Sequence, residues 1–176
     1  MAVKTGNSRG NEIDGTGGDD RLLGRGGNDE LDGKGGRDKL YGGSGHDELD
    51  GDSGNDLLYG GSGNDDLDGG SGRDKLYGGS GRDELDGDRG NDVLYGGKGA
   101  DRFVFDRNDG RDKIQDFKVG EDRIEIDIDA INGFGALNIY DNAKGNAVID
   151  FGGGNTVTLK GVAKADLGAS DFLFDS

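Results

Sequence analysis

Tyr41-Gly-Gly-Ser-Gly-His-Asp-Glu-Leu49 and Tyr77-Gly-Gly-Ser-Gly-Arg-Asp-Glu-Leu85 are two copies of a nine-residue block that decides the fold of this chain. The block occurs ten times in succession between Asp14 and Phe103, without a slip in register. Glycine always occupies the second and fifth positions and aspartate the seventh, while the ninth is leucine in every block except the last. A fixed period of this kind indicates a solenoid, in which each repeat stacks on its neighbours.

Each block combines a flexible turn with a very short strand. The two glycines let the backbone turn through positive φ with its carbonyl groups exposed, and the aspartate adds an anionic oxygen beside them. Carbonyl and carboxylate oxygens suit calcium, which takes about 6–8 oxygen ligands, and they suit zinc or copper poorly. The remaining x-Leu-x predicts a strand whose central side chain points inward while its neighbours point outward.

These residues resemble the RTX (haemolysin-type) calcium-binding repeat, Gly-Gly-x-Gly-x-Asp-x-Leu-x, over about half of the chain. The resemblance implies an all-β fold, a right-handed parallel β-roll in which each turn holds calcium jointly with the turn one full coil away. The chain departs from the family at the third position of half the blocks, where the family prefers glycine. The departing residues are Thr16, Arg25, Lys34, Asp52 and Asp88.

A second period, twice the length of the block, predicts two blocks per coil and two different sheets. The first position of the block alternates between Leu or Tyr and Asp. The eighth position alternates with it, between a basic or aliphatic residue and, except at Arg102, an acidic one. One sheet should therefore present basic and aromatic rungs, such as Lys39-Leu40-Tyr41 and Lys75-Leu76-Tyr77, with Tyr59 and Tyr95 in the same ladder. The other should present acidic rungs such as Glu48-Leu49-Asp50, with neighbouring coils about 4.8 Å apart.

With two blocks per coil, the resemblance places each calcium ion between aspartates that are two blocks apart in the sequence. The expected ligands are Asp20, Asp38, Asp56, Asp74 and Asp92 on one side and Asp29, Asp47, Asp65, Asp83 and Asp101 on the other. The four intervals between successive aspartates on each side give about eight ions, and Asp112 and Asp122 add room for one or two more. Eight divalent ions would carry +16, against a formal charge of −16. Backbone carbonyl ligands are expected around Gly42, Gly43, Gly45, Gly51, Gly54, Gly60, Gly61, Gly63, Gly69, Gly70, Gly72, Gly78, Gly79, Gly81, Gly87 and Gly90.

Composition also indicates dependence on a ligand. Only 30% of the 176 residues are hydrophobic, 40 are glycine, and no cysteine is available for a disulfide. Such a chain resembles a disordered one, so calcium is the natural source of the missing folding energy. The acidity also argues against nucleic acid as a partner.

The flanks of the repeats divide the chain into three expected segments. Residues 1–13 are a polar lead-in, either frayed or a partial first coil, without an apolar signal region or a membrane span. Residues 14–103 form the β-roll. Residues 104–176 alternate apolar and polar side chains in short runs, which predicts a β-rich cap with two imperfect extra rungs that place Asp112 over Asp92 and Asp122 over Asp101. The cap should contain a hairpin at Gly152–Asn155 and a helical turn at Ala165–Gly168.

The C-terminal part also resembles the segment that lies beyond the repeats in many RTX proteins. The residues concerned are Asp112–Phe117, Gly120–Ile124 and Asp171–Phe174. In that family an uncleaved C-terminal signal directs export through a type I secretion channel. The resemblance therefore implies a secreted, extracellular protein with the type I secretion machinery as a partner.

The residues do not favour an enzyme. There is one histidine, His46, at a variable turn position, and no serine stands beside a candidate base. Three hypotheses remain: a calcium-driven folding and secretion module, a module that binds an acidic polysaccharide such as alginate, and self-assembly of basic face on acidic face. The second resembles the repeat modules of mannuronan epimerases and would use Lys39, Tyr41, Tyr59, Lys75, Tyr77 and Tyr95. The alternative for these tyrosines is simple cross-strand packing, and for the acidic rungs a solvated face.

Overall fold

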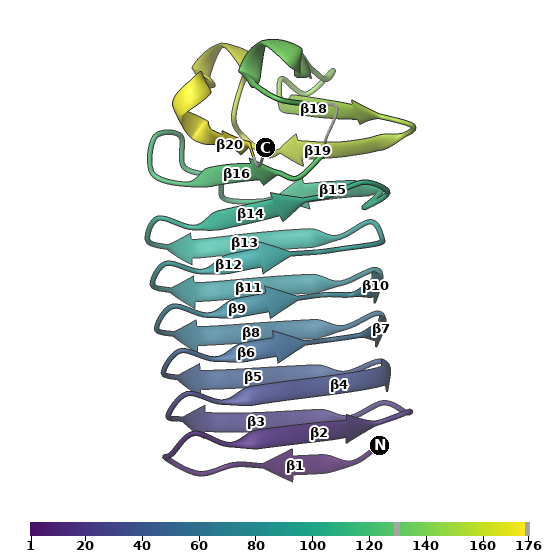
Figure 1. Cartoon of the computed structure of the whole chain (residues 1–176), viewed down its shortest axis with the longest axis vertical. Helices are drawn as coiled ribbons and strands as arrows, with labels where there is room; N and C mark the ends of the chain where they lie inside the picture. Colours follow the sequence, from purple (N-terminus) through teal and green to yellow (C-terminus); the bar gives the residue numbers. More distant parts are fainter. Residues whose placement is uncertain (129–130, 175–176) are drawn as a thin grey trace.

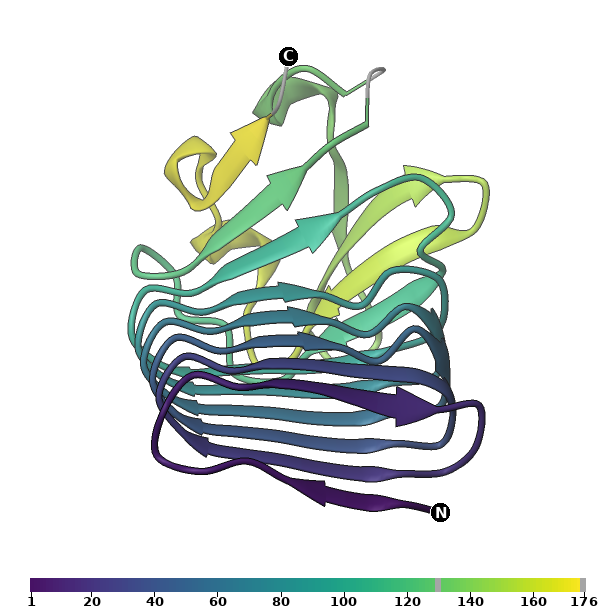
Figure 2. The same ribbon diagram turned by 60° about the horizontal axis from the view of Figure 1, so that its bottom comes forward.

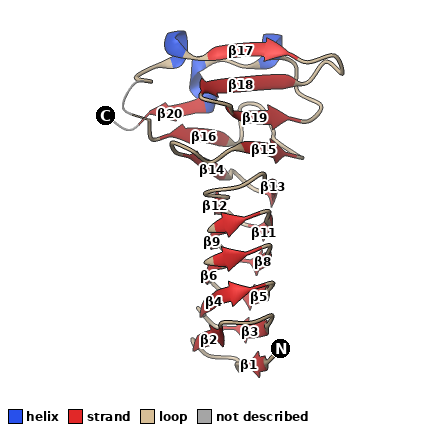
Figure 3. Cartoon of the chain, turned by 90° about the vertical axis from the view of Figure 1, so that its right-hand side faces the viewer, coloured by secondary structure: helices blue, strands red, loops and turns tan. Residues whose placement is uncertain are grey.

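The computed structural model describes residues 1–128 and 131–174 and shows a stack of flattened coils that ends in a β-rich cap (Figure 1). Two sheets face each other across the coils, as seen in the tilted view (Figure 2). The cap is wider than the roll that it covers (Figure 3). The expected all-β class and parallel β-roll are confirmed.

The first sheet contains the basic and aromatic rungs and continues into the cap. In spatial order its strands are β1 (Val3–Thr5), β3 (Arg21–Gly26), β5 (Lys39–Ser44), β8 (Leu57–Ser62), β11 (Lys75–Ser80), β13 (Val93–Lys98), β15 (Arg111–Ile114), β19 (Asn155–Leu159), β18 (Ala147–Gly152) and β17 (Asn138–Asp141). The pairing is parallel from β1 to β19 and antiparallel in the last two steps.

The second sheet contains the acidic rungs. Its strands are β10 (Ser71–Gly72), β7 (Ser53–Gly54), β4 (Glu30–Gly36), β6 (Glu48–Asp50), β9 (Asp66–Asp68), β12 (Glu84–Asp86), β14 (Arg102–Phe105), β16 (Arg123–Ile126) and β20 (Phe172–Phe174), with β2 (Glu12–Thr16) paired to β4. The described residues also form three short 3₁₀ helices, η1 (Phe134–Ala136), η2 (Lys164–Asp166) and η3 (Ala169–Asp171).

The register of the strands shows that one coil contains two blocks. Tyr59 pairs with Tyr41 on one side and with Tyr77 on the other, and each partner is two blocks away in the sequence. The ninth-position leucines of both sheets point between the sheets and are at most 1% exposed. A narrow column of leucines is therefore the core of the roll, and side chains at alternate positions face outward.

The first thirteen residues continue the stack. Val3 pairs with Arg21, and Glu12 pairs with Glu30, both in parallel. Of the two alternatives for this segment, the structure therefore shows a partial first coil.

Beyond Phe103, two degenerate blocks extend the roll. After Val104 and Phe105, the stretch Asp106–Ile114 keeps the fifth-position glycine, the seventh-position aspartate and the apolar ninth residue. After Gln115, Asp116–Ile124 does the same. These blocks are the two extra rungs: the backbone N–H of Asp92 donates to Oδ1 of Asp112 at 2.8 Å, and that of Asp101 to Oδ1 of Asp122 at 3.0 Å.

The cap contains the expected hairpin, in which Gly152 pairs with Asn155 across Gly153 and Gly154 at positive φ. Only the first half of the helical turn expected at Ala165–Gly168 is helical, as part of η2, and η3 begins just after it. Leu167, between them, has an extended backbone, which ends the first helix.

Candidate functional site

The seventh-position aspartates form two continuous ladders along the edges of the roll. In each ladder, Oδ1 of one aspartate accepts a hydrogen bond from the backbone N–H of the aspartate one coil earlier, at 2.6–3.1 Å. The structure thus brings together the eight expected pairs: Asp20/Asp38, Asp38/Asp56, Asp56/Asp74, Asp74/Asp92, Asp29/Asp47, Asp47/Asp65, Asp65/Asp83 and Asp83/Asp101.

In nine of these ten residues, the other carboxylate oxygen has no hydrogen-bond partner within the described part of the chain. Nine seventh-position aspartates have a buried Oδ2 atom without a hydrogen bond: Asp29, Asp38, Asp47, Asp56, Asp65, Asp74, Asp83, Asp92 and Asp101. Their side chains are 1–3% exposed. A buried carboxylate oxygen without a partner is costly, so a row of them indicates an absent cationic partner.

Each unpartnered oxygen faces the inner side of its own glycine turn. A Cβ atom added at Gly60 would lie 2.5 Å from Oδ2 of Asp65 and 2.8 Å from the carbonyl oxygen of Gly78, in the next coil. Gly78 stands in the same relation to Asp83 and to the carbonyl oxygen of Gly96. Glycine is therefore required at the second position because a side chain would fill the space that these oxygens share.

This donor set fits calcium. It consists of carboxylate and carbonyl oxygens, which are the ligands of hard cations. The described residues contain no cluster of three or more His, Cys, Asp or Glu side chains able to hold a metal, so backbone carbonyl groups must complete any site. The stacked glycine turns supply such carbonyl groups, because the carbonyl oxygen of one turn lies beside the second-position glycine of the turn one coil earlier.

Burial raises the pKa of the aspartates in the middle of the ladders. The pKa of Asp56 and Asp65 rises to about 6, and that of Asp74 and Asp83 to about 7, chiefly because burial disfavours the charged form. The charges of the aspartates in neighbouring coils raise it further, against the hydrogen bond from the backbone. Without a cation, the ionised aspartates of the ladders therefore destabilise the folded roll.

The two ends of the ladders differ from the middle. Oδ2 of Asp20 accepts hydrogen bonds from the backbone N–H and the hydroxyl group of Thr16, both at 2.7 Å. Oδ2 of Asp122 accepts from the backbone N–H of Lys118 at 2.8 Å, and the Lys118 ammonium group donates to the carbonyl oxygen of Gly97 at 2.7 Å. At these expected ligands, protein groups therefore occupy both carboxylate oxygens.

Four of the five turns that lack the third-position glycine keep the positive φ angle that glycine adopts there, and Thr16 is the exception. Arg25, Lys34, Asp52 and Asp88 have φ angles of 83°, 70°, 63° and 49°. The backbone N–H of Asp52 donates to Oδ1 of Asp50 at 2.8 Å, and Asp88 makes the same bond to Asp86. The first-position aspartates of the acidic rungs thus stabilise the turns, a role that the alternation in sequence did not reveal.

The aromatic ladder forms as expected on the first sheet. The rings of Tyr41, Tyr59, Tyr77 and Tyr95 stack with centroids 5.1, 4.7 and 4.5 Å apart, and the Arg21 guanidinium group lies 5.2 Å from the Tyr41 centroid. The rings are half-buried rather than fully exposed, since each covers its neighbour.

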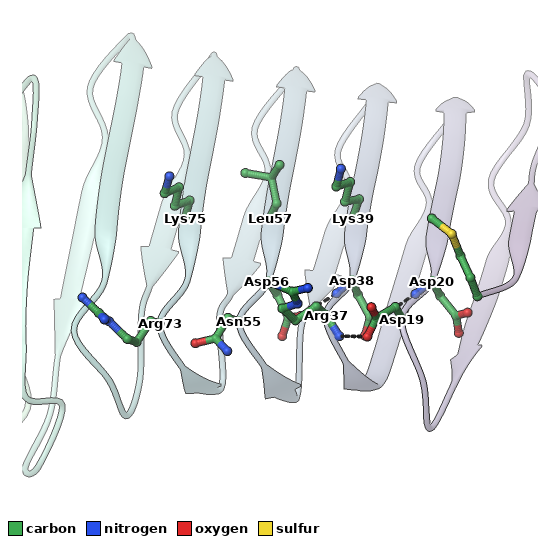
Figure 4. Close-up of a pocket in the computed structure, with 11 residues that line it drawn as sticks. Asp19, Asp20, Arg37, Asp38, Lys39, Asn55, Asp56, Leu57, Arg73 and Lys75 are labelled. Atoms are coloured by element: carbon green, nitrogen blue, oxygen red, sulfur yellow. Dashed lines mark hydrogen bonds between the residues drawn. The ribbon is translucent and has the colours of Figure 1, made fainter.

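A groove of about 400 Å³ lies at one edge of this sheet. Lys39 and Lys75 extend from strands on the same side as Leu57, and Arg37 and Arg73 come from the turns below them (Figure 4). Asp38 and Asp56 also line it. His46, by contrast, belongs to a turn on the other edge, where its Nδ1 atom accepts the backbone N–H of Asn64 at 2.8 Å.

Comparisons with known proteins agree with this geometry. The sequence model of the RTX calcium-binding nonapeptide repeat matches residues 5–40, 41–76, 69–103 and 77–114. No curated protein matches the chain. Across residues 1–128 and 131–174, no helix has the length and apolar character needed to span a membrane.

Three solved structures are similar to this chain. The AlgE6R2 subunit of the Azotobacter vinelandii mannuronan C5-epimerase is 26% identical with a TM-score of 0.50, over 92% of this chain and 91% of that one. The AlgE6R3 subunit of the same organism's epimerase is 27% identical with a TM-score of 0.36, over 96% and 80%. The extracellular lipase LipA from Serratia marcescens is 20% identical with a TM-score of 0.44, over 99% of this chain, which spans 40% of the lipase.

Proposed function

The chain belongs to the family of RTX calcium-binding nonapeptide repeats, and from that premise we propose that it is a calcium-folded module of a secreted protein. Its role is to remain unfolded during export and to fold on meeting extracellular calcium. We assign it no catalytic function, because the seventh-position aspartates belong to the ladders and the first-position Asp50 and Asp86 stabilise turns.

The observation that carries this proposal is the row of nine buried Oδ2 atoms without partners in the described chain. Calcium held between stacked turns would give each of these oxygens a cationic partner. Asp38, Asp56, Asp74 and Asp92 would serve one edge of the roll, and Asp29, Asp47, Asp65, Asp83 and Asp101 the other. Carbonyl groups of the glycine turns would complete the ligand set.

The energetic argument follows from the narrow core. Each coil buries only two leucine-type side chains, which is a small hydrophobic gain against the entropy of ordering every residue of two blocks. The charged ladders oppose folding as well. Calcium that binds only the folded coil contributes its binding free energy to folding.

Calcium concentration would then separate the two states. Extracellular calcium modules bind at about 10⁻⁴–10⁻³ M, far above cytosolic concentrations. The chain would therefore stay extended enough for a type I secretion channel inside the cell. Asp171 and the following strand β20 resemble the C-terminal end of RTX proteins, where the uncleaved signal lies, and we assign them that role here.

Circular dichroism of the full chain tests the proposal. We expect a disordered far-UV spectrum in excess chelator and a cooperative gain of β signal on adding millimolar calcium. Equimolar magnesium is the control, because its demand for near-octahedral geometry suits these turns poorly. A full β spectrum in chelator that calcium leaves unchanged would contradict the proposal.

A second function is favoured by the aromatic ladder and the basic groove. Stacked tyrosine rings can pack against sugar rings, while Lys39, Lys75, Arg37 and Arg73 can neutralise uronate carboxylates. The similarity to the AlgE6R2 subunit of a mannuronan C5-epimerase supports an acidic polysaccharide such as alginate. Calorimetry with alginate oligomers in calcium tests it, with neutral oligosaccharides as the control. Absence of calcium-dependent heat would leave only the folding and secretion role.

A further inference from the structure

The degenerate block Asp106–Ile114 places an additional acidic residue inside the roll. Its fourth position is Asp109, where the ten regular blocks have glycine, serine or a basic residue. Asn108 before it has a φ angle of 75°, the value that Gly70 has at the corresponding third position two coils earlier. The block therefore keeps the shape of a repeat turn while its fourth side chain is replaced by a carboxylate.

The Asp109 side chain is fixed within the protein. It is 3% exposed, its Oδ2 atom accepts the backbone N–H of Asp106, and its carbonyl oxygen accepts the backbone N–H of Gly90 at 2.7 Å. Its Oδ1 atom is buried and has no hydrogen-bond partner among the described residues. Oδ2 of Asp92, in the turn one coil earlier, is in the same condition.

These carboxylates lie within reach of one another's charge. Burial, followed by the charges of Asp106 and Asp88, raises the pKa of Asp109 to about 6, while Arg89 acts in the opposite direction. The charge of Asp109 in turn adds to the effect of burial on Asp92 and Asp86, whose pKa values rise to about 7. Between regular turns, first-position aspartates such as Asp50 and Asp68 also act on the seventh-position carboxylates, and here Asp109 adds a fourth-position carboxylate.

We propose that Asp109 is an additional carboxylate ligand for a divalent cation held between the turns 86–92 and 106–112, together with Asp92 and backbone carbonyl groups. The hard, all-oxygen donor set selects calcium. The inference rests on the proposed calcium-dependent folding and adds that this site is the tightest in the roll. Affinity at calcium sites rises with the number of charged ligands and with their rigidity, and Asp109 supplies both.

Calorimetric calcium titration of the chelator-treated full chain tests the assignment. The wild type should show one site at least tenfold tighter than the remaining sites. Asp109→Asn, which keeps the shape of the side chain, should remove that tight phase and leave the others. Asp127→Asn is the matched control, since Asp127 is exposed and its charge also reaches Asp106; its isotherm should equal that of the wild type.

Two results would overturn the assignment. One is a wild-type isotherm for Asp109→Asn, which would mean that Arg89 balances Asp109 without a metal. The other is a wild-type titration with no tight phase. A wild-type chain that binds no calcium would instead refute the proposed function itself, so the two failures are distinguishable.

Hydrogen exchange of the wild type gives a test that does not depend on how the variant folds. At one calcium ion per chain, amide protection should appear first in peptides spanning residues 86–114, which include the Gly90 N–H bonded to Asp109. Protection that begins in residues 32–58, or in all turns together, would contradict the proposal.

Discussion

The backbone N–H of Asp56 donates a 2.6 Å hydrogen bond to Oδ1 of Asp74, the aspartate one full coil further along the chain. This contact fixes the rotamer of Asp74 and turns its Oδ2 atom toward the glycine turn, where the described chain offers it no partner. The same relation repeats along both edges of the roll. One side chain thus links neighbouring coils with one oxygen and presents the other for a cation.

Removing an aspartate from the middle of a ladder should raise the calcium midpoint of folding more than removing one at its end. In Asp56→Ala the backbone N–H of Asp38 loses its acceptor, a loss on the order of 1–3 kcal/mol, and two neighbouring sites lose a ligand. Asp65→Ala should behave alike. Asp20→Ala affects only the outermost coil, so its calcium midpoint by circular dichroism should rise least. Equal midpoints for the three variants would contradict sharing of ions between coils.

The fifth-position glycines should differ in how well they tolerate substitution, although all of them occupy the same position of the repeat. A Cβ atom at Gly63 would lie 1.5 Å from the carbonyl oxygen of Gly45, and its φ angle is 130°. A Cβ atom at Gly18 would meet nothing within 4 Å. We expect Gly63→Ala to prevent its coil from stacking on the preceding one. Gly18→Ala should change the free energy of unfolding by less than about 0.5 kcal/mol. Calcium-dependent thermal melts compare the two, and a similar loss in both would refute the explanation.

Acid should favour the metal-free roll. The pKa of Asp74 and Asp83 is raised from 3.8 to about 7 in the fold. Folding therefore favours the neutral carboxyl groups. Their contribution to the stability of the roll is complete below about pH 3.8 and is lost as the pH rises through about 7. In excess chelator, the β signal should be larger at pH 5.0 than at pH 7.5. Asp74→Asn combined with Asp83→Asn should reduce that difference, and a β signal that falls on acidification would contradict the prediction.

The tyrosine ladder should separate polysaccharide binding from calcium binding. Tyr59→Ala removes a ring that stacks on both Tyr41 and Tyr77, and Lys75→Glu reverses a charge beside the groove. Both variants should weaken alginate binding while the calcium midpoint stays unchanged. Glu48→Gln, on the opposite sheet, is the control for a change of charge. Wild-type alginate affinity in both variants would leave the ladder a purely structural role.

The sequence by itself determined the coil. A strict nine-residue block whose outward-facing positions alternate from one block to the next requires that like residues stack. The leucine core, the tyrosine ladder and the aspartate pairs could therefore all be predicted from spacing. The extra rungs at Asp112 and Asp122 were also predictable, because the motif Asp-x-aliphatic survives there.

Only the tertiary structure decided which of these aspartates lack a second partner. Thr16 and Lys118 satisfy the end residues through contacts that depend on local turn geometry. Asp109 escaped prediction because the insertion Val104-Phe105 shifts its block, so that its fourth position is no longer found by counting nines from the regular repeats. Periodicity fixes the positions that repeat along a solenoid, whereas the direction of a carboxylate oxygen is set by the hydrogen bonds and burial that neighbouring coils impose.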